Sequence, residues 1–119
     1  MDLSEILNEK KLGHGGWSKE DIYRQLGYGA LQGIDWAQTR TIAKNPDRWK
    51  EIGPVTSRLL GDHPSVGQVN NYFLASTLAN TLLAHQLPPE WRKIFQYLNI
   101  GYGAQNNLKN YKLGIGMTF

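Results

Sequence analysis

The segment from His63 to Pro89 contains no Asp, Glu, Lys or Arg, and this constrains the fold more than any other feature of the sequence. Its periodicity predicts a helix over residues 66–85. Ser65 is a suitable N-cap for that helix, and the prolines at 88 and 89 follow its end. Apolar side chains project from every side of the helix, so it must be buried on every side.

Three surroundings could bury such a helix: neighbouring subunits, the rest of its own chain, or a membrane. Its length of about 30 Å would suit a bilayer. Seven amide or hydroxyl side chains oppose lipid, because they need hydrogen-bond partners once water is removed. They are Gln68, Asn70, Asn71, Ser76, Thr77, Asn80 and Thr81. Since 119 residues can hardly surround the helix alone, we favour neighbouring subunits and keep membrane contact through 66–85 as an alternative.

A second helix is predicted over about residues 19–44. Ser18 and Asp21 have the spacing of a capping box, and Pro46 disfavours helix at Asn45. Its apolar stripe consists of Ile22, Leu26, Ala30, Ile34, Ala37 and Thr41. Gly29 and Gly33 lie in the same stripe, which predicts close approach of another backbone, either from this chain or from another subunit.

A third helix is expected from the prolines at 88 and 89 to about Asn110, because proline is tolerated in a first helical turn. Its stripe consists of Trp91, Ile94, Phe95, Leu98 and Tyr102. The connection over 45–64 is long and contains a possible short helix near 56–60. Connections of this length are commonly functional or contact a partner.

Both ends of the chain have patterns of their own. Residues 2–11 predict a short helical arm, and the glycines up to Gly16 predict a hinge. Apolar and other residues alternate over 111–119, with Tyr111, Leu113, Ile115, Met117 and Phe119 on one face. This pattern is typical of a β-strand. Because the chain offers no second strand, we expect it to pair with another chain; an extended arm packed on the helices is the alternative.

These elements predict a mainly α fold with three principal helices, a short N-terminal helical arm and a C-terminal β-strand. The expected organisation is an arm and hinge over 1–16, a helical domain over 17–110 and the strand over 111–119. The predicted interface residues are Gly29, Gly33, Tyr111, Leu113, Ile115, Met117 and Phe119.

Residue types that carry catalytic or metal chemistry are sparse. The absence of cysteine excludes disulfides and thiolate metal sites, and His14, His63 and His85 do not have metal-ligand spacing. Asp35 shares a helix face with polar side chains, which favours an ordinary polar surface. We therefore expect no enzyme activity, cofactor or metal, while the roles of Asp35 and His63 stay open.

The charge pattern does not favour nucleic acid as a specific partner. The formal net charge is +3 and the isoelectric point is about 9.2, but the basic residues are spread along the chain. The densest basic stretch consists of Arg40, Lys44, Arg48 and Lys50 beside Trp49. Asp47 and Glu51 dilute it, so a solvated surface is the favoured interpretation.

Two blocks of sequence carry a resemblance to a known family. The first is Asp35-Trp36-Ala37-Gln38-Thr39, continued by Ile42-Ala43 and Asn45-Pro46-Asp47-Arg48. The second is His63-Pro64-Ser65-Val66-Gly67, continued by Val69-Asn70 and Tyr72-Phe73. Over roughly residues 30–119 the chain resembles a family of small, largely uncharacterised proteins from bacteria and their phages. Family members often carry an apolar leader, whereas residues 1–5 are acidic and predict none.

The resemblance implies an accessory protein of a phage or bacterium and transfers no catalytic residue. Together with the residue patterns, it predicts a non-enzymatic structural or assembly protein that works as a homo-oligomer or with other virion proteins. The expected location is the virion, as a small tail, portal-associated or ejected internal protein. The alternative is an envelope-associated accessory protein that contacts a membrane partner.

Overall fold

The computed structural model describes residues 16–49, 56–61 and 63–119. Its helices are α2 (Lys19–Lys44), α3 (Thr56–Leu60), α4 (Val66–Gln86) and α5 (Pro89–Lys112). The mainly helical prediction is confirmed, and so are the bounds of the principal helices within about two residues. The predicted arm over 1–16 lies outside the described residues except for Gly16.

Local capping signals explain why the helices begin where they do. The Ser18 hydroxyl accepts a hydrogen bond from the Asp21 amide at 3.0 Å, and the Asp21 carboxylate accepts one from the Ser18 amide at 3.0 Å. Ser65 and Gln68 form the same reciprocal pair at the start of α4. Each pair satisfies two amides that a helix start leaves open, so these boundaries are fixed by a few neighbouring residues.

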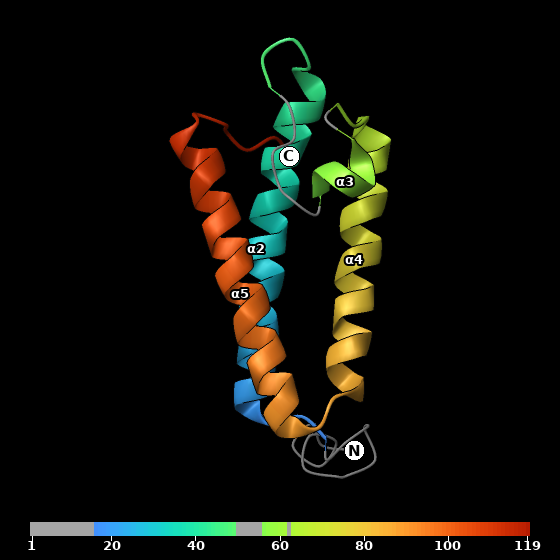
Figure 1. The fold of residues 1–119 in the computed structure, drawn as a ribbon, viewed down its shortest axis with the longest axis vertical. Coiled ribbons are helices and arrows are strands. Elements are labelled where there is room, and N and C mark those ends of the chain that lie inside the picture. Colours follow the sequence, from blue (N-terminus) through green and yellow to red (C-terminus); the bar gives the residue numbers. More distant parts are fainter. Residues whose placement is uncertain (1–15, 50–55, 62) are drawn as a thin grey trace.

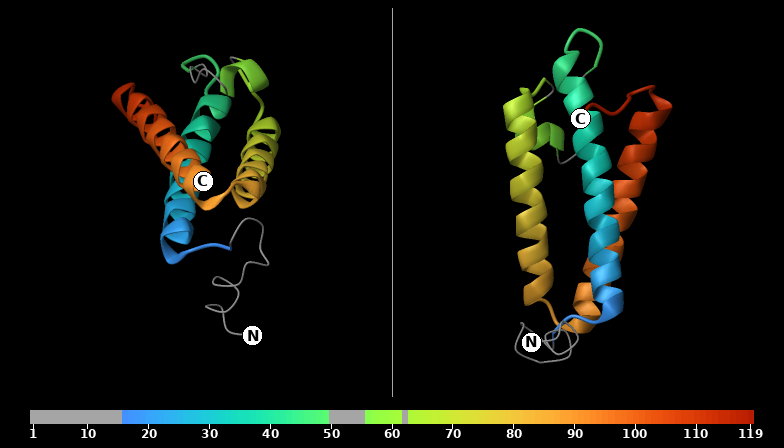
Figure 2. Two further views of the ribbon diagram at one scale, coloured as in Figure 1. Left: turned by 60° about the horizontal axis from the view of Figure 1, so that its bottom comes forward. Right: turned by 180° about the vertical axis from the view of Figure 1, so that it is seen from behind.

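α4 and α5 form the two arms of a V, and α2 lies behind them in the view of Figure 1 (Figures 1 and 2). α4 runs antiparallel to α2 and α5, and α2 packs along both of them. α4 and α5 meet near Leu87 and Pro88 and diverge from there, so they contact each other much less. The polar face of α2 therefore lies between the two arms of the V.

α2 and α5 bury much of their polar faces, which corrects the expected orientation of α2, although Ala37 of its stripe is buried. Leu26 and Ile34 of the same stripe are exposed, whereas Asp35 on the opposite face is buried. On α5 the buried residues are Arg92, Gln96, Asn106, Asn107 and Asn110. α4 differs, because its buried residues are Val69, Phe73 and Ala84. A 3.6-residue period of apolar residues shows that a helix has an apolar and a polar face, but it does not show which face the other helices contact.

The described part of the chain does not surround α4. Leu74, Leu78 and Leu82 are exposed by 64%, 57% and 64%. The inner side of α4 instead presents hydroxyl and amide groups to α2. The suggestion that the chain buries this helix by itself is therefore wrong for the described residues.

A close approach between helices occurs at other glycines than those the sequence indicated. A Cβ added at Gly29 or Gly33 would meet no atom within 4 Å, so the described residues do not make the predicted crossing. A Cβ at Gly103 would lie 3.3 Å from Leu31 Cβ, and one at Gly27 would lie 3.9 Å from Ile100 Cδ1. The small residues that matter for packing within the chain thus lie where α2 meets α5.

The C-terminal segment is not a strand in the described single chain, so the predicted strand and its pairing with another chain are not shown. α5 continues to Lys112, and the remaining residues turn at Gly114 and lie against α2. The Thr118 amide donates to the Ala37 carbonyl at 2.9 Å, and the Thr41 hydroxyl donates to the Gly116 carbonyl at 2.7 Å. Ile115 lies inward, and backbone and side-chain groups of α2 take the place of a second strand in bonding Gly116 and Thr118.

We expect Gly103→Leu to lower the free energy of unfolding by about 1–3 kcal/mol, because Leu31 leaves no room for the added side chain. Gly101→Leu is the matched control, since a Cβ at Gly101 meets nothing within 4 Å. The control should be neutral or stabilising by up to about 1 kcal/mol, because leucine favours helix more than glycine does. Urea unfolding followed by circular dichroism measures both, and equal stability of the two variants would contradict the close packing of α2 on α5.

Candidate functional site

A buried arginine joins all three long helices at the closed end of the V. Arg92 is fully buried on the first turn of α5, and its guanidinium donates to the carbonyls of Ala84, His85 and Leu87 at 2.8, 3.4 and 3.0 Å. It also donates to the Gly16 carbonyl at 2.7 Å. Arg92 thus satisfies carbonyls that the C-terminus of α4 leaves open and places a cation at the negative end of that helix.

The same guanidinium forms a salt bridge with the start of α2. Its distance to Asp21 Oδ2 is 3.1 Å, and both side chains are buried. Arg24 pairs with the other Asp21 oxygen and donates through Nε to Gln96 at 2.8 Å. The Trp17 ring lies 5.0 Å from the Arg92 guanidinium and donates its indole N–H to His85 at 3.1 Å. This set, which we call the Arg92 cluster, closes the narrow end of the V.

Amide and hydroxyl groups also join α2 to α4 along their length. Gln25 donates to Asn80 and Thr81 at 3.1 and 2.9 Å. About two helical turns further along α2, Gln32 donates to the hydroxyls of Ser76 and Thr77 at 3.2 and 3.0 Å. The need for hydrogen-bond partners at Ser76, Thr77, Asn80 and Thr81 argued against lipid around α4. These side chains have their partners on α2.

Buried amides join α2 to α5 in the same way. Asn106 and Thr39 both donate to Asp35 Oδ1, at 3.1 and 3.3 Å. Higher up, Asn110 donates to Gln38 at 3.1 Å, and Gln38 donates to the backbone carbonyl of Asn107 at 3.2 Å. Asp35 is consequently a buried part of the helix interface, and its expected place on an ordinary polar surface is wrong.

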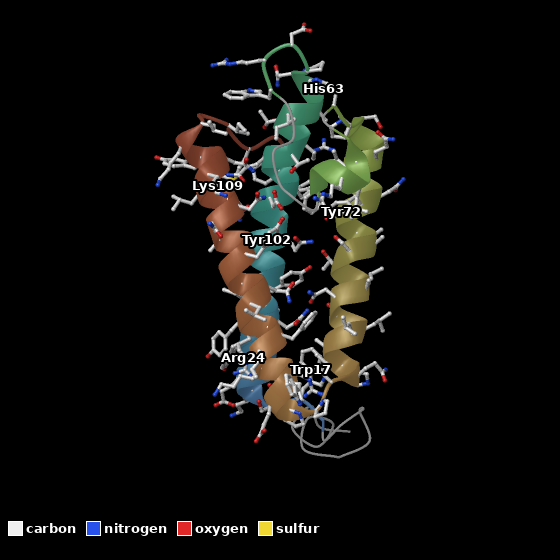
Figure 3. All side chains as sticks on the ribbon, in the orientation of Figure 1. Trp17, Arg24, His63, Tyr72, Tyr102 and Lys109 are labelled. Atoms are coloured by element: carbon white, nitrogen blue, oxygen red, sulfur yellow. The ribbon has the colours of Figure 1, made fainter. Side chains whose placement is uncertain are left out.

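A cavity of about 320 Å³ opens between the two arms of the V, with α2 as its floor. Its lining residues are Tyr28, Leu31, Gln32, Asp35, Tyr72, Ser76, Asn80, Asn99, Tyr102 and Gly103. Each long helix contributes one tyrosine, and Tyr72 on α4 and Tyr102 on α5 lie on opposite sides of it (Figure 3). This is the candidate site for a small ligand, and we call it the tyrosine pocket.

The environment of the tyrosine pocket disfavours phenolate formation at its floor. Burial raises the pKa of Tyr28 from 10.0 to about 12, and the charges of Tyr72 and Asp35 act in the same direction. A hydrogen bond with Thr77 acts in the opposite direction. Tyr28 therefore stays neutral at physiological pH and offers a ring face and a hydroxyl.

The predicted interface residues fall into two groups. Gly29 and Gly33 line a shallow groove of about 290 Å³ between α2 and α4, together with Trp36, Phe73 and Leu74. At the other end of the chain, Tyr111, Leu113, Met117 and Phe119 are exposed, whereas Ile115 is buried. The Phe119 ring lies 6.2 Å from the Trp36 ring, so the C-terminus reaches the helix that carries the glycines.

Other sequence candidates have ordinary surroundings. His63 is exposed, while His14 and Lys50 lie outside the described residues. Arg40 donates to Asn70 at 2.9 Å and to the Thr118 carbonyl at 3.2 Å, so it joins α2 to α4 and to the C-terminal segment. No group of three or more His, Cys, Asp or Glu that could hold a metal lies in the part of the chain that the structure describes.

Sequence reasoning missed the Arg92 cluster and the tyrosine pocket. The available signal was Arg92 itself, which shares a helix face with Gln96, Asn106 and Asn110 and follows two prolines. A polar face of this kind looks solvated until its partners on the other helices are known.

Comparisons with known proteins gave no match to a family model, a curated protein or a solved structure. Within residues 16–49, 56–61 and 63–119, no helix combines the length and apolar character needed to cross a membrane.

We expect Arg92→Met to lower the free energy of unfolding by about 3–5 kcal/mol, because the change leaves Asp21 and several carbonyls buried with fewer donors. Lys93→Met is the matched control, since Lys93 is the exposed neighbour on the same turn. Urea unfolding measures both variants. A similar midpoint for Arg92→Met and the control would show that the cluster contributes little to stability.

The raised pKa of Tyr28 makes stability depend on pH above 10. The unfolded chain ionises this tyrosine near pH 10.0 and the folded chain near pH 12, so its stabilising contribution is complete below pH 10 and is lost as pH rises to about 12. We expect Tyr28→Phe to lose less stability than the unsubstituted chain over that range. Urea unfolding at a series of pH values measures the difference, and parallel profiles would contradict it.

Proposed function

We propose that this chain is a non-enzymatic assembly protein whose exposed apolar belt is covered by other protein subunits. The belt consists of Leu26, Ile34, Leu74, Leu78, Leu82, Ile94, Leu98 and Leu108, which lie on all three long helices. The observation that carries the proposal is that large apolar side chains are exposed on all three long helices, while α2 and α5 bury amide and charged side chains. Large apolar side chains left exposed in this number are typical of a binding surface.

The belt is also free of exposed charge over the middle of each helix. Between Gln25 and Thr39 of α2 the one charged residue is the buried Asp35, and α5 has none between Ile94 and Leu108. Charged residues lie at both ends of α2 and α5, whereas α4 contains no Asp, Glu, Lys or Arg. The charge-free length is about 20 Å at 1.5 Å per residue. The depletion of charge is typical of the centre of a protein interface.

Two exposed amides in the belt favour protein over lipid as its cover. Asn71 on α4 and Gln105 on α5 both face outward. Either side chain would lack hydrogen-bond partners in hydrocarbon, whereas a protein partner can supply them. The groove beside Gly29 and Gly33 adds a place where another backbone could approach closely, since Cβ atoms added there meet none of the described residues within 4 Å.

The C-terminal segment is the second part of the proposed interface. Met117 and Phe119 are exposed beside α2, and Tyr111 and Leu113 extend this apolar surface at the end of α5. In an assembly this segment could leave α2 and pair with a strand of another chain. Its hydrogen bonds to α2 go to Ala37, Arg40 and Thr41, and such an exchange would replace them together with the contact between Phe119 and Trp36.

We propose a phage virion component as the setting of this assembly role, because the sequence resembles small proteins of bacteria and their phages. The partners would be further copies of this chain or other virion proteins. An envelope-associated accessory protein is the second candidate. The charge-free middle of α2 and α5, with charged residues at both ends, supports the envelope role. Hydrocarbon also accepts an apolar surface that carries no charge.

The assembly role predicts that Leu78→Asp dissociates the protein without unfolding it. Leu78 is more than half exposed in the single chain, so the helical circular dichroism should persist, whereas a carboxylate in a dry interface is costly. Size exclusion with light scattering should show an oligomer for the unsubstituted chain and 13.5 kDa for the variant. His63→Asp places the same charge on an exposed residue outside the belt and should stay oligomeric.

Two outcomes separate the candidates. A detergent-free, monodisperse monomer of the unsubstituted chain would contradict the assembly role. A monomer that needs detergent and floats with phospholipid vesicles, with Leu78→Asp remaining in the soluble fraction, would favour the envelope role instead.

A further inference from the structure

The tyrosine pocket has a chemical character that the assembly role does not use. Its wall contains three aromatic rings, Tyr28, Tyr72 and Tyr102, which come from α2, α4 and α5. It also contains one carboxylate, Asp35, and no Lys, Arg or His. In a chain with a net charge of +3, the lining thus combines one negative charge with aromatic side chains and has no cationic residue.

Aromatic rings and a carboxylate together recognise one class of ligand. The face of an aromatic ring carries partial negative charge and attracts a cation within about 6 Å. Rings that converge from several directions are the common means of holding quaternary ammonium groups. A nearby carboxylate adds a full negative charge, whose attraction is stronger where surrounding protein excludes water.

We propose that the tyrosine pocket binds a small organic cation of the ammonium class. Its volume of about 320 Å³ lies at the lower end of the range for small-molecule sites and would admit a compact ligand. An anionic ligand would meet Asp35 without a compensating cation in the lining. The binding is independent of the assembly role, because the pocket lies between the arms of the V and the belt lies outside them.

The polar contacts around the pocket hold it in a shape suited to this ligand. Gln32 is fixed by its bonds to Ser76 and Thr77, and Asp35 accepts from Asn106 and Thr39. A quaternary ammonium group donates no N–H hydrogen bond, so Asp35 can attract it through charge while keeping its own hydrogen bonds. Tyr102 is 41% exposed at the rim, which leaves its ring accessible to a ligand.

Calorimetric titration of the full chain with choline tests the proposal, with dimethylbutanol, the uncharged carbon isostere of choline, as the matched probe. We expect choline to bind at least about tenfold more tightly than the isostere, because the two differ in charge and hardly in shape. Equal affinity would overturn the proposal, as would an absence of choline binding. Binding of glucose in place of choline would also overturn it, by assigning the pocket to neutral polyols.

Two variants locate the binding in the pocket. Tyr102→Leu should weaken choline binding by about tenfold, and Asp35→Asn by more, while dimethylbutanol binding by Asp35→Asn should change little. Tyr97→Leu is the control, since Tyr97 is an exposed tyrosine of the same helix outside the pocket. Circular dichroism checks that each variant is folded, and Tyr102→Leu keeps the test decisive should Asp35→Asn unfold. Unchanged choline affinity in Tyr102→Leu would overturn the proposal.

Discussion

The fully buried guanidinium of Arg92 is the contact on which the arrangement of the helices depends. It is bonded to the end of α4 through three carbonyls, to the start of α2 through Asp21, and to the chain before α2 through Gly16. Arginine suits this position because its planar group offers five donors in fixed directions and keeps its charge when buried. The cluster fixes the closed end of the V, and the divergence of α4 and α5 from that point leaves room for the tyrosine pocket.

Above this cluster, directional bonds determine how the helices align. Apolar faces can slide past one another with little change in energy, but Gln25 and Gln32 meet their α4 partners in one register only. The interior therefore specifies geometry through hydrogen bonds, and a large apolar area stays available outside. This division explains how the same three helices can hold a defined pocket and present an apolar belt.

The sequence was informative about features that depend on neighbouring residues. Ser18 with Asp21, Ser65 and the prolines at 88 and 89 predicted the helix ends because capping involves residues three or four apart. It misled wherever the answer depended on residues far apart. The inward side of α2 follows from partners more than 40 positions away, such as Ser76 for Gln32 and Asn106 for Asp35. The period-2 pattern after Tyr111 likewise could not show that α2 would satisfy that backbone.

The hydrogen bonds between Gln25, Gln32 and α4 lie in a partly open interior, where water competes for the same groups. Such bonds strengthen when the surrounding medium becomes less polar. Any partner that covers the outside of α4 would also reduce the access of water to its inner side. Association and internal order would then be thermodynamically linked, so that this chain would become more rigid when a partner covered it.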